Sequence, residues 1–356
     1  MERIRIGAYF HIFLFFFNIF KILLYTIIYI MTDKETLIDI IKKARPNVKD
    51  STIKMYTANL TKLKKLFDSE DYKFLKDPEK VNEKLGDLHY TTKRNYYNAI
   101  LIYLMAIAKD DKDMKEDPLI IKYNEMRDQG NQTYQDNQAT GVISDKQKAS
   151  FVPIEEINKM IEEMGQEIKD QKIKKKADLT AKDKALIQSY ILFNIYTRLP
   201  LRNDVAGMET INKRSYNKLS QEEKKSKNHL VVNKNTIFME LNKFKTSAKY
   251  ESIKIPIEKD LEKLLRFYIR VNGMGVLFKS GTGKALTRNE LSKLLIKETK
   301  KRMGKSISTT MLRKIYLSSK YADVKEDMEN DAKIMGHSVA TGQSVYVKKA
   351  QEEEPK

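Results

Sequence analysis

Residues 335–346 read Met-Gly-His-Ser-Val-Ala-Thr-Gly-Gln-Ser-Val-Tyr and lie close to the end of a chain of 356 residues. They place a Gly-His-Ser turn nine residues before a tyrosine, Tyr346. Because the chain contains 19 tyrosines, a His and a Tyr at this separation would by themselves indicate only ordinary packing. The meaning of this stretch depends on the residues that precede it in the chain.

The composition is strongly basic. The chain has 67 Lys and Arg residues against 48 Asp and Glu residues, a formal net charge of +19. Such an excess attracts a polyanion, either a nucleic acid or an acidic membrane surface. A Lys-rich proteome in which every surface is basic would give the same charge.

The composition also excludes several kinds of chemistry. Because the chain has no cysteine, it can form no disulfide, thiolate metal site or cysteine nucleophile. Its four histidines are scattered along the chain and are too far apart in the sequence to indicate a zinc cluster. The sequence therefore predicts neither a metal nor a cofactor.

The first 30 residues have a different character from the rest. Residues 7–30 are almost wholly apolar, long enough to span a membrane as a helix, and preceded by Arg3 and Arg5. An ordinary soluble sequence begins at Met31. We favour Met31 as the physiological start, with residues 1–30 a mis-assigned extension. A true membrane anchor is the alternative, and a membrane is a partner only if residues 1–30 are present.

The remainder divides into two predicted domains. In residues 32–125 the apolar positions recur every three to four residues, which predicts a small helical domain. Residues 126–150 are polar and aperiodic, which predicts a linker. Residues 151–356 form the second predicted domain.

The second domain combines helices with a small sheet. Residues 236–241 and 252–256 alternate in polarity and are joined by a Lys-rich turn, which predicts a β-hairpin. Helical spacing returns afterwards. The predicted fold is mainly α with a small antiparallel β-sheet. The helices that we expect after the hairpin are 257–271, 287–302, 309–320 and 328–336.

Four short segments of this domain contain the residues of chemical interest. Each is a weak signal alone, but together they place Arg, Lys, Arg, His and Tyr in a fixed order. The segments are Thr-Arg-Leu-Pro-Leu-Arg-Asn-Asp-Val at 197–205, Asn-Lys-Phe-Lys-Thr-Ser-Ala-Lys at 242–249, Ser-Thr-Thr-Met-Leu-Arg-Lys at 308–314, and the stretch 335–346.

At these positions the sequence resembles the tyrosine recombinases, the phage-integrase family. Members of that family have an Arg after a Gly-Leu-like turn, a Lys on a β-hairpin, a His-x-x-Arg helix, and a Gly-His turn nine residues before the nucleophilic tyrosine. The resemblance covers residues 151–356 and implies a mixed catalytic domain. More weakly, residues 32–125 resemble the family's helical core-binding domain.

The resemblance implies a role for each residue of the series. Two residues of the hairpin turn, Lys243 and Lys249, are alternatives for the lysine. The implied catalytic residues are Arg202, Lys245, Arg313, His337 and Tyr346.

Two positions depart from the family pattern. Thr310 stands where the family has the histidine of His-x-x-Arg, which changes any hydrogen-bonding or proton-transfer role at that place. Pro200 replaces the glycine of the first motif, which alters the turn but leaves the arginine. The site residues also have non-catalytic interpretations: Arg202 could pair with Asp204, and His337 could be a core histidine.

The chemistry of the family is consistent with these residue types. Two guanidiniums stabilise the negative charge of a pentavalent phosphate with paired donors. The resemblance implies that Tyr346 attacks the scissile phosphate and forms a covalent 3′-phosphotyrosine. It further implies that Lys245 protonates the leaving 5′-oxygen, and that His337 binds the phosphate or helps to remove the phenolic proton. Neither ATP nor a metal is required.

The leading hypothesis is therefore a site-specific recombinase or integrase that acts on double-stranded DNA. The resemblance implies a homo-multimer, a tetramer on two DNA sites. We expect a viral or mobile-element origin and an intracellular location, in the cytoplasm, the nucleus or a virion. The alternatives are a type IB topoisomerase-like enzyme and a catalytically impaired DNA-binding relative, the latter because of Thr310.

Overall fold

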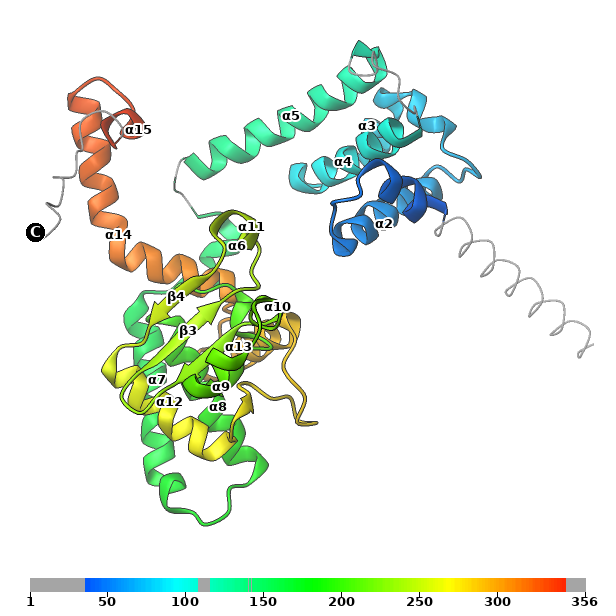
Figure 1. The fold of residues 1–356 in the computed structure, drawn as a ribbon. Coiled ribbons are helices and arrows are strands. Elements are labelled where there is room, and N and C mark those ends of the chain that lie inside the picture. The colour runs from blue at the N-terminus through cyan, green and yellow to red at the C-terminus, as the bar shows by residue number, and fades with distance from the viewer. Residues whose placement is uncertain (1–35, 108–115, 140, 142, 344–356) are drawn as a thin grey trace, which may run out of the picture. The chain divides into compact units, whose positions relative to one another are not determined.

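The computed structural model describes residues 36–107, 116–139, 141 and 143–343 (Figure 1). It divides into two compact units, residues 1–142 and 143–356. The apolar segment 7–30 and Tyr346 lie outside the described residues. Within the part of the chain that the structure describes, no helix is both long enough and apolar enough to cross a membrane.

The first unit is helical throughout its described residues, as the apolar spacing predicts. Helix α4 packs against both α2 and α5, and together these helices enclose an apolar core. Tyr123 is fully buried in this core, and its hydroxyl donates to the main-chain oxygen of Leu75 at 2.9 Å. Residues 36–44 are also helical, and the other helices are α2 (Asp50–Leu66), η1 (Lys73–Lys76), α3 (Pro78–Leu85), α4 (Tyr90–Ile107) and α5 (Pro118–Ala139).

Helix α5 differs from the prediction because it extends into the segment predicted as a linker. Residues 126–139 of that segment are helical, and the division between the two units falls after residue 142. Side chains of α4 hold this polar helix. Arg94 donates to Asn131 at 3.3 Å, and its guanidinium lies 5.2 Å from the ring centre of Tyr134. Contacts of this kind stabilise a helix without any apolar periodicity, so the sequence pattern does not predict it.

The second unit is built around helix α8 (Ala181–Tyr196). Its apolar side chains are buried on nearly every side, as expected of a helix at the centre of a core. It packs against four long helices, and one of them, α14, also contacts α7. These helices are α7 (Ile154–Asp170), α12 (Lys259–Asn272), α13 (Arg288–Met303) and α14 (Thr309–Ile334).

A five-stranded sheet packs on the same core. The predicted hairpin is confirmed as β3 paired antiparallel with β4, with Met239 opposite Ile255. The sheet as a whole is mixed rather than antiparallel, because β1 runs parallel to β2. Parallel neighbours need a crossover connection, and here it consists of the short helices α9 (Lys213–Lys218) and α10 (Gln221–Ser226). The strand order is β4 (Ile253–Pro256), β3 (Ile237–Leu241), β2 (His229–Val232), β1 (Glu209–Asn212) and β5 (Gly275–Val276).

Helix α14 also differs from the prediction. The separate helices predicted at 309–320 and 328–336 are one continuous helix, Thr309–Ile334. Residues 321–327 contain neither Gly nor Pro, so nothing in them breaks a helix. The first turns of α14 are buried, whereas residues 317–327 are all exposed. In Figure 1 the helix extends away from the body of the second unit and carries α15 (Val339–Thr341) near its end.

Candidate active site

The first predicted arginine follows the end of α8. The Tyr196 ring is fully buried there, and its hydroxyl donates to the main-chain oxygen of Arg202 at 3.1 Å. Burial raises the pKa of Tyr196 well above its usual range, so this phenol stays a neutral donor. The Arg202 side chain is exposed. The core thus fixes the main chain at Arg202, and the guanidinium is exposed, where it can bind an anion from solution.

The second predicted arginine reaches the same turn from α14. Ser308 caps this helix by accepting from the amide of Met311 at 3.3 Å. Arg313, in the helix's second turn, donates from Nε to the main-chain oxygen of Pro200 at 3.0 Å, across 113 positions of sequence. Proline lacks an N–H but keeps its carbonyl, so the departure from the family pattern at Pro200 leaves this bond possible.

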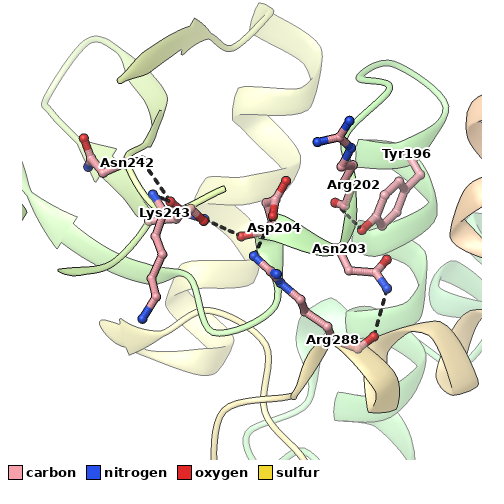
Figure 2. Close-up of polar contacts among 8 residues, drawn as sticks. Tyr196, Arg202, Asn203, Asp204, Asn242, Lys243 and Arg288 are labelled. Atoms are coloured by element: carbon pink, nitrogen blue, oxygen red, sulfur yellow. Dashed lines mark hydrogen bonds and ion pairs between the residues drawn. The ribbon is translucent and has the colours of Figure 1, made fainter. Parts of the chain in front are cut away.

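A buried carboxylate lies beside these arginines. Asp204 accepts from Nη2 of Arg288 at 2.8 Å, and its side chain is 8% exposed against 57% for the arginine. Burial raises the pKa of Asp204, and the charges of Arg288, Arg202 and Arg313 oppose that effect. Figure 2 shows the Arg288 side chain directed at Asp204, next to the turn that carries Arg202. The structure therefore pairs Asp204 with Arg288, and not with Arg202 as the non-catalytic interpretation supposed.

Arg288 was not among the residues predicted from sequence. It is the first residue of α13, directly after the capping residue Thr287. Its main-chain oxygen also accepts from the side chain of Asn203 at 2.9 Å. Its local sequence is that of an ordinary helix start, so the chain offers no signal for its place beside Asp204.

The predicted lysine lies in the loop that follows β3, residues 242–246, here called the lysine loop. Lys243 and Lys245 are both exposed and flank Phe244, which is 7% exposed and belongs to the core. Lys249 lies with its ammonium 5.2 Å from the ring centre of Tyr250. The structure leaves both Lys243 and Lys245 open to solvent, and in Figure 2 the Lys243 side chain points away from Arg202.

The main chain of the lysine loop is tied to the arginine segment. The side chain of Asn228, just before β2, hydrogen-bonds the main chain of Asp204 and that of Lys243. The tie brings the lysine loop alongside the segment that carries Arg202 (Figure 2).

The predicted Gly-His-Ser turn is present at the end of α14. Gly336 has φ of +71°, which favours glycine, and it ends the helix, after which His337 donates its main-chain amide to Ala332 at 3.0 Å. Ser338 caps α15. The ring of His337 is half-buried rather than in a core, and Nδ1 lies 2.9 Å from the Ser338 oxygen.

The structure does not bring His337 to the arginines. Arg313 lies near the start of α14 and His337 just beyond its end, so about 30 Å of helix separates them at a rise of about 1.5 Å per residue. Thr310 is exposed one turn before Arg313. Of the five predicted residues, Arg202 and Arg313 meet, Lys245 lies in the tied loop, His337 lies apart, and Tyr346 is outside the described residues.

Comparison with known proteins gives two solved structures of interest. The chain is similar to the crystal structure of XerA recombinase, with 12% identity, 87% of this chain and 92% of that chain covered, and a TM-score of 0.32. It is also similar to the XerH site-specific recombinase bound to difH substrate in a pre-cleavage complex, with 18% identity and a TM-score of 0.41. The similarity covers 87% of this chain and 80% of that chain. Both neighbours are recombinases. No protein-family model and no curated protein matches the chain.

Proposed function

We propose that this chain is a site-specific DNA recombinase that cleaves and rejoins DNA through a covalent 3′-phosphotyrosine at Tyr346. One observation carries the proposal. Arg202 and Arg313 come from segments far apart in the sequence and meet at one turn, beside the buried carboxylate of Asp204. Asp204 is already paired with Arg288, so the positive charges of Arg202 and Arg313 exceed what this carboxylate neutralises and favour a bound anion such as a phosphate.

The reaction follows from the residue types. Tyr346 gives up its phenolic proton to solvent water as its oxygen attacks the scissile phosphorus, and the bond from phosphorus to the 5′-oxygen breaks. A proton from a lysine of the lysine loop goes to that oxygen, and Arg202 and Arg313 bind the equatorial oxygens. A 5′-hydroxyl of a second strand then attacks the phosphotyrosine and returns a proton to the lysine. The bond from phosphorus to the Tyr346 oxygen breaks, and that oxygen takes up a proton from water. The phosphotyrosine linkage conserves the free energy of the broken phosphodiester bond, so rejoining needs no external energy source.

The partner is double-stranded DNA. The net charge of +19 attracts the phosphate backbone over distances longer than any single contact. Exchange of strands between two duplexes requires more than one active site, so the proposal includes a homo-multimer on two DNA sites.

Two observations favour a second candidate, a DNA-binding relative that has lost strand cleavage. Thr310 replaces the family's histidine, and His337 lies about 30 Å along α14 from Arg313, at about 1.5 Å of rise per residue. A protein of this kind would bind the same DNA and form no covalent product.

The first prediction separates these candidates. The protein is incubated with a pool of nicked duplexes of randomised sequence, in which the cleaved strand loses its short 5′-hydroxyl fragment and cannot be rejoined. We expect detergent-resistant protein–DNA adducts in the native chain and none in Tyr346→Phe, because phenylalanine has no nucleophilic oxygen. Sequencing of the trapped DNA gives the target site.

Tyr321→Phe is the matched control, since Tyr321 is an exposed tyrosine of α14. It should form adducts at the native rate, and Tyr346→Phe should keep native affinity for the DNA. Adducts that persist in Tyr346→Phe would sink the assignment of the nucleophile. Binding without any adduct in the native chain would establish the second candidate, and relaxation of any supercoiled plasmid without site preference would indicate a topoisomerase.

A further inference from the structure

We propose that Asn228 is a positioning residue that sets the distance between the lysine loop and the phosphate-binding arginines. The inference rests on the proposed function and adds to it a residue that touches neither DNA nor the reacting atoms. Asn228 lies directly before β2, and its side chain is buried, at 6% exposed.

The Asn228 side chain uses all of its hydrogen-bonding groups. Its Nδ2 donates to the main-chain oxygens of Asp204 at 2.8 Å and Lys243 at 3.1 Å. Its Oδ1 accepts from the main-chain amides of Asn242 at 2.9 Å and Lys243 at 2.7 Å. A primary amide offers two donors and one oxygen with two lone pairs, so this side chain is fully satisfied.

The four bonds replace main-chain pairing where the sheet ends. The β3–β4 ladder has its last pair at Leu241 and Ile253, so the amides of Asn242 and Lys243 lie beyond it. Asn228 itself is held by the sheet, because its main-chain oxygen accepts from the amide of Glu209 at 3.0 Å. A fixed residue therefore supplies the lysine loop with the partners that the sheet does not.

The same side chain reaches the arginine segment. Asp204 is two residues beyond Arg202, and its carboxylate is held by Arg288. One Nδ2 group thus bonds both the segment that carries Arg202 and the loop that carries the proton donor. The relative position of the two segments depends on this amide.

The position of the lysine loop relative to the arginines matters for proton transfer in particular. General acid catalysis contributes about 10²–10⁴-fold to a rate and needs the donor within hydrogen-bond reach of the leaving oxygen. A shift of about 1 Å in a catalytic group can cost about 10²-fold. Loss of the tie should therefore impair protonation of the 5′-oxygen while leaving DNA affinity unchanged.

The test uses the full chain and the target site found by adduct trapping. Two substrates are compared: the ordinary phosphodiester, and one with sulfur in place of the scissile 5′-oxygen. The thiolate leaves without protonation, so a defect in the proton donor disappears on the sulfur substrate. We expect Asn228→Asp, which keeps the acceptor oxygen and loses both donors, to slow adduct formation about 10²-fold on the oxygen substrate and to be nearly native on the sulfur substrate.

Comparison variants make the result specific. Lys243→Ala or Lys245→Ala, whichever removes the proton donor, should show the same rescue by sulfur, whereas Arg202→Ala should be slow on both substrates. Asn272→Asp is the matched control, since its Nδ2 donates to two main-chain oxygens, of Val276 and Leu277, both at 2.9 Å. It should show the native ratio of the two rates.

Equal slowing of Asn228→Asp on both substrates would overturn the inference, and so would a native rate on the oxygen substrate. A second measurement does not depend on catalysis: Asn228→Ala should speed hydrogen exchange at the amides of Asn242 and Lys243, and unchanged exchange would also overturn it. If the native chain forms no adduct on either substrate, the proposed function itself fails, whatever the exchange result.

Discussion

At the scale of single residues, the two arginines are held in different ways. Arg313 uses its Nε on the Pro200 oxygen, which fixes the plane of the guanidinium. Arg202 is exposed, and the core holds only its main chain, through the Tyr196 hydroxyl. Arg313 is thus already oriented, whereas in the proposed reaction the Arg202 side chain still has to be ordered when a phosphate binds.

The substitution Arg313→Lys tests this difference. A lysine ammonium is a point charge that cannot bond the Pro200 oxygen through one nitrogen and present a planar fork of donors to a phosphate. We expect adduct formation to fall about 10²–10³-fold, the usual cost of one transition-state donor, with little change in DNA affinity. Single-turnover cleavage and a binding titration measure the two effects.

Arg270→Lys serves as the comparison, because Arg270 is an exposed residue of α12. It should cleave at the native rate. Native cleavage by Arg313→Lys as well would show that the oriented guanidinium has no part in the reaction.

The sequence predicts some residues of the candidate site and gives no indication of others, for one reason. Arg202 and Arg313 lie in short segments whose order and spacing could be compared with a family pattern. Arg288 and Asn228 belong to the candidate site only through contacts with residues distant in the sequence, in Asp204 and the lysine loop. Nothing in the sequence around either residue marks such a contact.

At the scale of elements, the start of α8, at the opposite end of this helix from Arg202, has a complete cap. Thr180 and Asp183 form a capping box, and Lys176 donates to the Asp183 carboxylate at 2.8 Å. The hydrogen bond from Lys176, with those from Thr180, lowers the pKa of Asp183 to about 2. The ionised carboxylate therefore stabilises the fold.

The substitution Asp183→Asn should lower the free energy of unfolding at neutral pH. Because the pKa in the folded state lies below the ordinary value of 3.8, the contribution of Asp183 is fully present above about pH 4 and is lost as the pH falls through about 2. The difference between the native chain and the variant should thus be constant from pH 7 to about pH 4 and then shrink. Urea unfolding at a series of pH values measures it.

Asp260→Asn is the control for that series. Asp260 pairs with Lys263 at 3.1 Å on an open surface, where an ion pair contributes little. Its free energy of unfolding should match that of the native chain at every pH. If the difference in free energy of unfolding between the native chain and Asp183→Asn grew as the pH fell, it would contradict the lowered pKa of Asp183.

The elements also show what apolar periodicity can predict. It finds the hairpin strand β3 and amphipathic helices such as α12, because each turns one face to the core and the other outward. It divides α14 into two helices because residues 317–327 are exposed and have no face to bury. It misses β1, whose four residues Glu-Thr-Ile-Asn become a strand only by pairing with β2. Apolar periodicity therefore predicts helices and strands that have a buried face, and it does not predict those that form through strand pairing or polar contacts.

At the scale of the whole molecule, each unit has a core of its own. The buried clusters of the first and second units share no residue. The core of the second unit draws on helices and on the sheet, from Val152 to Ile315. A core of this kind does not depend on the first unit for its packing.

We therefore predict that residues 143–356 fold without the first unit. The fragment should unfold cooperatively in urea, followed by circular dichroism, and should protect the amides of α8 from hydrogen exchange as strongly as the full chain does. The full chain is the control. A gradual transition without protected amides would show that the second unit needs the first.

The turn at Pro200 has a consequence for the time before DNA arrives. Proline restricts the main chain even in the unfolded protein, so closing this turn costs less conformational entropy than it would with glycine. The Pro200 carbonyl is also the acceptor that orients Arg313. If the proposed function holds, Arg313 is thus oriented before DNA binds, and binding has to order only the exposed Arg202 side chain.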